Sequence, residues 1–183
     1  MRRFFSVIIC ILITLVAFGQ EKFFTKTGSI SFFSRTELED IDAHNRSVTC
    51  VLDTKTGNVQ FAVLMKGFEF KKALMQEHFN EDYIESNKYP RAEFKGQIVN
   101  NSSVDYTKEG VQQARVKGQL TIHGQTNEIE TDGTVSVKDG KIFIASEFPV
   151  AIADYKITVA AFAKKKVAKT VSVKVSCALE PLK

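Results

Sequence analysis

Apolar and polar residues alternate with a period of two along most of the chain, which is the pattern of half-buried β-strands. In the segment 91–99, Ala92, Phe94, Gly96 and Ile98 share one face, and charged or polar residues take the other. The same alternation predicts strands at about 28–36, 46–53, 59–67, 91–99, 114–122, 129–137, 141–150 and 171–179.

The segments between these strands carry the residues of tight turns, which favours antiparallel hairpins. DTKTGN at 53–58 separates two predicted strands, and HGQTNE at 123–128 separates two more. KDGK at 138–141 contains Asp139-Gly140, a strong signal for a two-residue hairpin turn. The polar segment 100–110 is predicted to be a loop.

One segment departs from the strand period. Phe70, Leu74, Met75, His78 and Phe79 have the spacing of a short amphipathic helix at about 71–80. Pro90 then marks the return to extended chain. Eight strands and one short helix predict an all-β fold, either an antiparallel barrel or a sandwich.

The first residues have the organisation of a secretory signal peptide. Arg2 and Arg3 precede an almost wholly apolar run at 4–18, and the small residues Ala17 and Gly19 favour cleavage before Gln20. The apolar run of about 15 residues is shorter than the roughly 20 that a membrane-spanning helix needs. We therefore expect a signal peptide at 1–19 and a single exported domain at 20–183.

The net charge and the cysteine content say little about the partner or function of the protein. The net charge of +4 falls to +2 without Arg2 and Arg3, too little to indicate a nucleic-acid partner. Cys50 and Cys177 remain in the exported chain, both on the apolar faces of predicted strands. A disulfide between them and a pair of buried free thiols are both compatible with the sequence.

The sequence carries little that indicates catalysis. His44, His78 and His123 show no metal-ligand spacing, and no nucleophile motif or phosphate-binding glycine loop is present. We expect no enzyme activity, no metal and no cofactor. The run Lys164-Lys165-Lys166 is better explained as a solvated loop than as a contact for anionic lipid.

The inward faces of the predicted strands combine small and large residues. Gly96, Gly118 and Gly133 lie at inward positions, and phenylalanines are frequent on the strands and near the helix. An eight-stranded barrel is just wide enough to hold a small ligand or to be filled by its own side chains. The composition supports a cavity and a filled core equally.

Three motifs resemble those of the YceI-like family. FEFKKALMQEHFNEDYIESNKYPRAEFKGQI at 68–98 resembles its core signature, through Tyr83, Glu85, Ser86, Tyr89 and Pro90 among others. VKGQLTIHGQTNEI at 116–129 and ADYKITV at 153–159 resemble two later motifs, in the family's order. Ala153 stands where the family often has an arginine, and if that arginine helps hold a polar head group, the ligand of this protein is expected to differ.

The resemblance implies an extended, lipocalin-like antiparallel barrel of eight strands, exported to the periplasm, with the helix covering one end. It implies a non-enzymatic protein that holds an isoprenoid, such as a quinone or polyprenol, or another long-chain lipid in an apolar tunnel, for transport, storage or sequestration. Transient membrane contact is a further expectation. The expected tunnel lining is Phe61, Phe68, Phe70, Leu74, Met75, Phe79, Phe94, Gly118, Leu120, Ile122 and Phe148.

A second hypothesis is a closed barrel without a lipid ligand that acts as a protein-interaction or stress-response module. It rests on the acids and aromatics of the segment 77–89, with Tyr83 and Tyr89 as the contact residues. The oligomeric state is not indicated by the sequence.

Overall fold

The computed structural model describes residues 21–161 and 163–182. The predicted signal peptide therefore lies outside the described residues and stays a prediction. No helix of the described residues has the length and apolar character needed to cross a bilayer.

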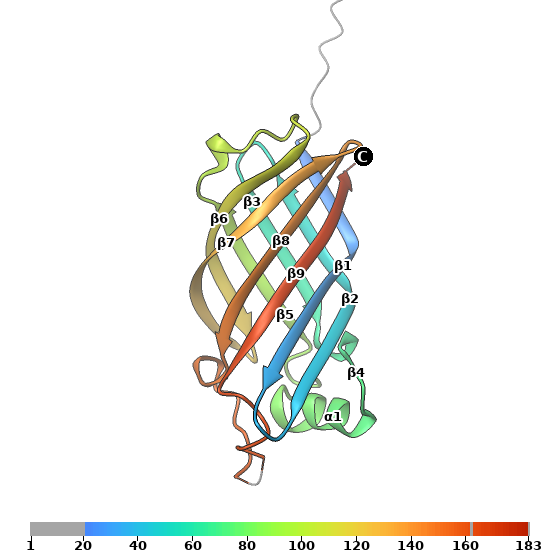
Figure 1. The fold of residues 1–183 in the computed structure, drawn as a ribbon, viewed down its shortest axis with the longest axis vertical. Helices are drawn as coiled ribbons and strands as arrows, with labels where there is room; N and C mark the ends of the chain where they lie inside the picture. Colours follow the sequence, from blue (N-terminus) through green and yellow to red (C-terminus); the bar gives the residue numbers. More distant parts are fainter. Residues whose placement is uncertain (1–20, 162, 183) are drawn as a thin grey trace, which may run out of the picture.

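Eight long antiparallel strands form a closed barrel, as the sequence predicted (Figure 1). The hydrogen-bonded order is β1-β9-β8-β7-β6-β5-β3-β2, and β2 pairs with β1 to close the ring. The barrel strands are β1 Lys22–Arg35, β2 Asp40–Asp53, β3 Asn58–Leu64, β5 Arg91–Ile98, β6 Gly110–Ile122, β7 Gln125–Lys138, β8 Lys141–Ala151 and β9 Thr170–Pro181. A two-residue strand, β4 Glu69–Phe70, pairs with β2.

Shorter elements lie at the two ends of the barrel. They are the 3-10 turns η1 Met65–Gly67, η3 Asn101–Ser103 and η4 Ile152–Tyr155, the helix α1 Ala73–His78 and the π-helical turn η2 Phe79–Tyr83. The predicted helix at 71–80 thus corresponds to α1 and the start of η2. The predicted strand at 59–67 ends at Leu64, where the chain turns into η1.

The alternation that predicted the strands is also the alternation of burial. In β5, Ala92, Phe94 and Ile98 are buried, and Arg91, Lys95 and Gln97 are exposed. Two hairpins close with two-residue turns, His123-Gly124 and Asp139-Gly140, in which every residue has a positive φ. The predicted turn at 123–128 is therefore shorter than expected, and β7 begins at Gln125.

β1 begins earlier than the sequence predicted. Its pairing with β2 shifts register between Thr25 and Gly28 and again before Ile30. Such bulges interrupt the period of two. The alternation at 22–27 was therefore not recognisable.

The two ends of the barrel are finished differently. Figure 1 shows the loop between β5 and β6 at one end, and α1 with the segment between β8 and β9 at the other. At the first end the strands carry the buried side chains Leu52, Val137, Ile142 and Leu179, covered by Val104 from the loop. We call this the closed end and the opposite one the mouth.

Candidate functional site

The barrel encloses an apolar cavity of about 460 Å³. All eight barrel strands contribute to its wall, together with α1, η2 and the segment 152–167. Pockets for small organic ligands have volumes of about 300–1,000 Å³ and mostly apolar walls. The interior is thus a cavity rather than a core filled by its own side chains.

The structure brings most of the predicted lining residues together on this wall. They are Phe61, Phe68, Phe70, Leu74, Met75, Phe79, Phe94, Leu120, Ile122 and Phe148. Leu74 lies at the edge of the cavity, with 62% of its surface exposed. Contact of these residues with a ligand stays a prediction.

Gly118 does not belong to the wall. A Cβ atom at Gly118 would lie 2.4 Å from Cα of Gly96 and 2.8 Å from Cζ of Phe94. The paired glycines therefore make room for the Phe94 ring and not for a ligand. Gly133, in contrast, does line the cavity.

Four phenylalanine rings form a cluster near the mouth. The Phe79 ring centroid lies 5.0 Å from that of Phe70, 5.5 Å from Phe68 and 5.6 Å from Phe32. These are ordinary distances for aromatic pairs. Sequence reasoning missed Phe32, although it shares the inward period of β1 with Ile30.

Three segments surround the mouth. The Nζ atom of Lys72, just before α1, lies 2.8 Å from Oε1 of Glu39 in the β1–β2 turn, and this bond lowers the pKa of Glu39 below its ordinary value. The backbone N–H of Ala168 donates to Oγ of Ser34 at 2.8 Å, which attaches the segment 156–169 to the end of β1.

The mouth is both apolar and basic on its outside. Leu38, next to Glu39 in the chain, and Leu74, two residues after Lys72, are 64% and 62% exposed. The segment 156–169 carries five lysines and no acidic residue. Lys164, Lys165 and Lys166 are all exposed.

Glu85 and Tyr89, in the segment that follows η2, contact His123 in the turn of the β6–β7 hairpin. His123 lies between two oxygen acceptors: its Nδ1 is 3.1 Å from the carbonyl oxygen of Tyr155, and its Nε2 is 2.9 Å from Oε2 of Glu85. The Tyr89 ring packs edge-on against the imidazole at 4.5 Å. We call Glu85, Tyr89, His123 and Tyr155 the latch.

A buried serine shapes the turn that leads to the latch. Ser86 is 1% exposed, its Oγ donates to Oδ1 of Asn80 at 2.6 Å, and its N–H donates to the carbonyl of Asn80 at 2.7 Å. Glu85 has a φ of 51°, which a non-glycine residue adopts at a cost. Ser86 and Asn80 therefore fix the turn that joins η2, at the mouth, to the latch.

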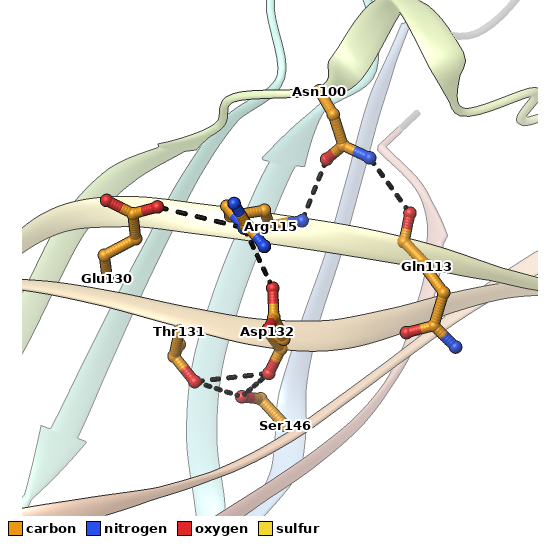
Figure 2. Close-up of polar contacts among 7 residues, drawn as sticks. All are labelled: Asn100, Gln113, Arg115, Glu130, Thr131, Asp132 and Ser146. Atoms are coloured by element: carbon orange, nitrogen blue, oxygen red, sulfur yellow. Dashed lines mark hydrogen bonds and ion pairs between the residues drawn. The ribbon is translucent and has the colours of Figure 1, made fainter.

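One part of the wall is polar. Thr131 of β7 and Ser146 of β8 line the cavity, and their hydroxyl groups lie near the carbonyl oxygen of Asp132 (Figure 2). Outside the barrel, Arg115 Nε lies 3.0 Å from Oδ1 of Asp132 and 3.8 Å from Oε1 of Glu130. The outward charges are thus paired with each other, and the cavity side has only hydroxyl groups.

The histidines do not form a metal site. His44 pairs with Asp42 at 2.9 Å, His78 with Asp82 at 2.6 Å, and His123 with Glu85. Within residues 21–161 and 163–182, no three or more His, Cys, Asp or Glu side chains are grouped so that they could hold a metal ion.

Cys50 and Cys177 are buried as free thiols that are hydrogen bonded to each other. That bond, together with burial, raises the pKa of the Cys50 thiol. A high pKa keeps a thiol protonated and unreactive.

Comparisons with known proteins agree with this geometry. A model of the YceI-like domain matches residues 17–179. No curated protein matches the chain in sequence.

Several solved structures share the fold. A polyisoprenoid binding domain from Saccharophagus degradans, implicated in plant cell wall breakdown, has a TM-score of 0.76 at 15% identity, over 89% of this chain and 99% of that one. BcnA of Burkholderia cenocepacia has a TM-score of 0.67 at 16% identity, over 83% and 95%. The YceI protein of Campylobacter jejuni has a TM-score of 0.56 at 16% identity, over 74% and 82%. With the family model matching nearly its whole length, the chain belongs to the YceI-like domain family, and its barrel has the fold of a polyisoprenoid-binding domain.

Proposed function

We propose that this protein is a non-enzymatic periplasmic carrier that holds an isoprenoid or another long-chain lipid inside the barrel. The observation that carries the proposal is the apolar cavity of about 460 Å³, to which every barrel strand contributes. Burial of apolar surface stabilises a bound chain by roughly 25 cal/mol per Å² without requiring specific polar groups. The Saccharophagus degradans domain with the same fold is described as polyisoprenoid binding.

The mouth supports a route for the lipid. The cavity wall extends to Lys166 and Val167, next to the basic segment 156–169 and the exposed Leu38 and Leu74. Lysines attract anionic lipid surfaces, and exposed apolar side chains can enter the boundary of the acyl region. We therefore include transient contact of the mouth with a membrane in the proposal.

The alternative of a closed interaction module has less support. Tyr83 lines the cavity, and burial raises its pKa above the ordinary value. Tyr89 packs against His123 in the latch. Both aromatic residues thus have structural positions, whereas the alternative needs them for a partner.

Native mass spectrometry of the protein expressed with its leader tests the proposal, followed by extraction and identification of the released lipid. Ala114 is buried on the cavity wall, so Ala114→Phe should fill the space and reduce lipid occupancy. Ala178→Phe is the matched control, because Ala178 is exposed on the outside of β9.

The proposal expects a stoichiometric lipid on the wild-type protein and on the Ala178→Phe variant, and a loss of lipid on the Ala114→Phe variant. Circular dichroism would establish that both variants fold. A protein that carries no lipid and takes up no added quinone, polyprenol or fatty acid would contradict the proposal.

A further inference from the structure

β7 and β8 separate halfway along the barrel. Their hydrogen-bonded pairing runs from Lys138↔Lys141 to Gly133↔Ser146. β7 nevertheless reaches back to Gln125, and β8 continues to Ala151. Within the described part of the chain, these remaining halves have no ladder between them. We call the point of separation at Gly133 and Ser146 the fork.

The cavity reaches both sides of the fork. Ile129 and Thr131 of β7 and Ser146 and Phe148 of β8 belong to its wall. Nearer the mouth, η4 packs on β7, where Nδ2 of Asn127 donates to the carbonyl of Asp154 at 2.9 Å. The fork is therefore the part of the cavity wall between η4 and the half of β7 and β8 in which the two strands are paired.

At the fork, two side-chain hydroxyl groups lie against one backbone carbonyl oxygen, that of Asp132. Oγ of Ser146 donates to the carbonyl oxygen of Asp132 at 2.8 Å, and Oγ1 of Thr131 lies 3.2 Å from the same oxygen (Figure 2). The two hydroxyl oxygens are 3.3 Å apart.

The hydroxyl protons of Thr131 and Ser146 are both engaged in hydrogen bonds within the protein. Each hydroxyl group has one proton and two lone pairs. The Ser146 proton goes to the Asp132 carbonyl, and the Thr131 proton goes either to that carbonyl or to Ser146 Oγ. The pair therefore presents lone pairs to the cavity, which accept a hydrogen bond and donate none.

We infer that the fork is a polar subsite for a long-chain lipid that carries a hydroxyl group, such as a long-chain alcohol, and that it discriminates against head groups that only accept hydrogen bonds. This inference rests on the proposed function and names the ligand class for the same cavity. A hydroxyl group on the ligand donates to Thr131 or Ser146. A quinone carbonyl, an ether or a carboxylate instead faces these lone pairs with lone pairs of its own.

The test compares a long-chain polyprenol with its methyl ether, because the two differ mainly in the donated proton. Binding is measured by displacement of a fluorescent lipid probe from the wild-type protein. A single hydrogen bond predicts that the alcohol binds about five-fold more tightly than the ether.

Thr131→Val and Ser146→Ala, made singly, should each reduce this preference and leave the affinity for the ether unchanged. The matched control is Thr121→Val or Thr126→Ala, since Oγ1 of Thr121 and Oγ1 of Thr126 form a pair at 2.8 Å on the outside of the same sheet. These control variants should keep the preference.

Equal affinities of wild-type protein for alcohol and ether would overturn the inference and leave the proposed function intact. That comparison requires no variant, so it stands even if a substitution at the fork unfolds the barrel. If neither ligand displaces the probe, the inference is overturned, whereas the proposed function is removed only if the protein also carries no lipid and takes up no quinone or fatty acid.

Discussion

The Sγ atom of Cys177 occupies the space that a side chain on Gly28 would need. A Cβ atom at Gly28 would lie 2.4 Å from this sulfur and 3.2 Å from the carbonyl oxygen of Val48. β1 lies between β2 and β9, so the glycine lets Cys50 and Cys177 meet across the intervening strand. The bulge of β1 is located at this position.

We expect Gly28→Ala to lower the free energy of unfolding by about 1–3 kcal/mol, the usual cost of forcing an additional group into a packed interior. In a Cys177→Ala background the cost should be smaller, because the nearest obstacle is then removed. Urea denaturation of the four proteins in reducing buffer gives the coupling. An equal cost of Gly28→Ala in both backgrounds would show that the sulfur is not the obstacle.

The latch predicts a difference between two histidines. His123 is 12% exposed, with two hydrogen-bond partners and the Tyr89 ring, whereas His78 is 44% exposed and pairs with Asp82 one helical turn away. His123→Ala should cost about 1–3 kcal/mol, from two hydrogen bonds and one ring contact. His78→Ala should cost about 0.5 kcal/mol or less. Chemical denaturation measures both, and similar costs would argue against the latch.

The strands could be predicted because one face of each is buried and the other is solvated. In β6, Ala114 and Leu120 are buried and Arg115 and Lys117 are exposed, and this pattern is visible in the sequence alone. The hairpin at Asp139-Gly140 was equally visible, since its residues suit the positive φ that the turn requires.

The latch and the fork could not be predicted in the same way. Glu85 and His123 lie 38 positions apart, and their contact depends on how the mouth is folded. The fork depends on where the β7–β8 ladder ends, which the uninterrupted alternation of both strands does not reveal. Gly118 had the inward position of a lining residue, but the Phe94 ring lies over it, a contact that only the folded barrel shows.

The basic segment at the mouth should direct membrane binding. We expect Lys164→Glu with Lys165→Glu to weaken binding to vesicles that contain phosphatidylglycerol by roughly 30-fold, from about 1 kcal/mol per lysine near an anionic surface. Vesicle flotation measures this binding. Lys108→Glu with Lys138→Glu is the matched control, because it changes the net charge equally with exposed lysines at the closed end.

Added salt should weaken wild-type binding to these vesicles, because the contact is electrostatic. Equal losses in the two double variants would show that only net charge matters and that the mouth has no particular role. Unchanged binding in the Lys164/Lys165 variant would remove the membrane contact from the proposal.

Tyr106 should make the stability of the closed end depend on pH in the alkaline range. Its Oη donates to Oδ1 of Asn101 at 2.7 Å, Asn101 Nδ2 donates to the carbonyl of Thr54 at 3.0 Å, and burial raises the pKa of Tyr106 to about 12. In the unfolded chain a tyrosine has a pKa of about 10. The stability from the buried phenol is therefore complete below pH ~10 and is lost as the pH rises through the folded value.

We expect the wild-type protein to be more stable than Tyr106→Phe at pH 8, by about 1 kcal/mol for one hydrogen bond. Between pH ~10 and ~12 this advantage should shrink, because the unfolded wild-type chain ionises Tyr106 before the folded protein does, and phenylalanine cannot ionise. Urea denaturation of both proteins at several pH values measures the difference, in which the effects of the other titrating groups cancel. A difference that stays constant up to pH ~12 would show that burial of Tyr106 in the β5–β6 loop does not hold its phenol neutral.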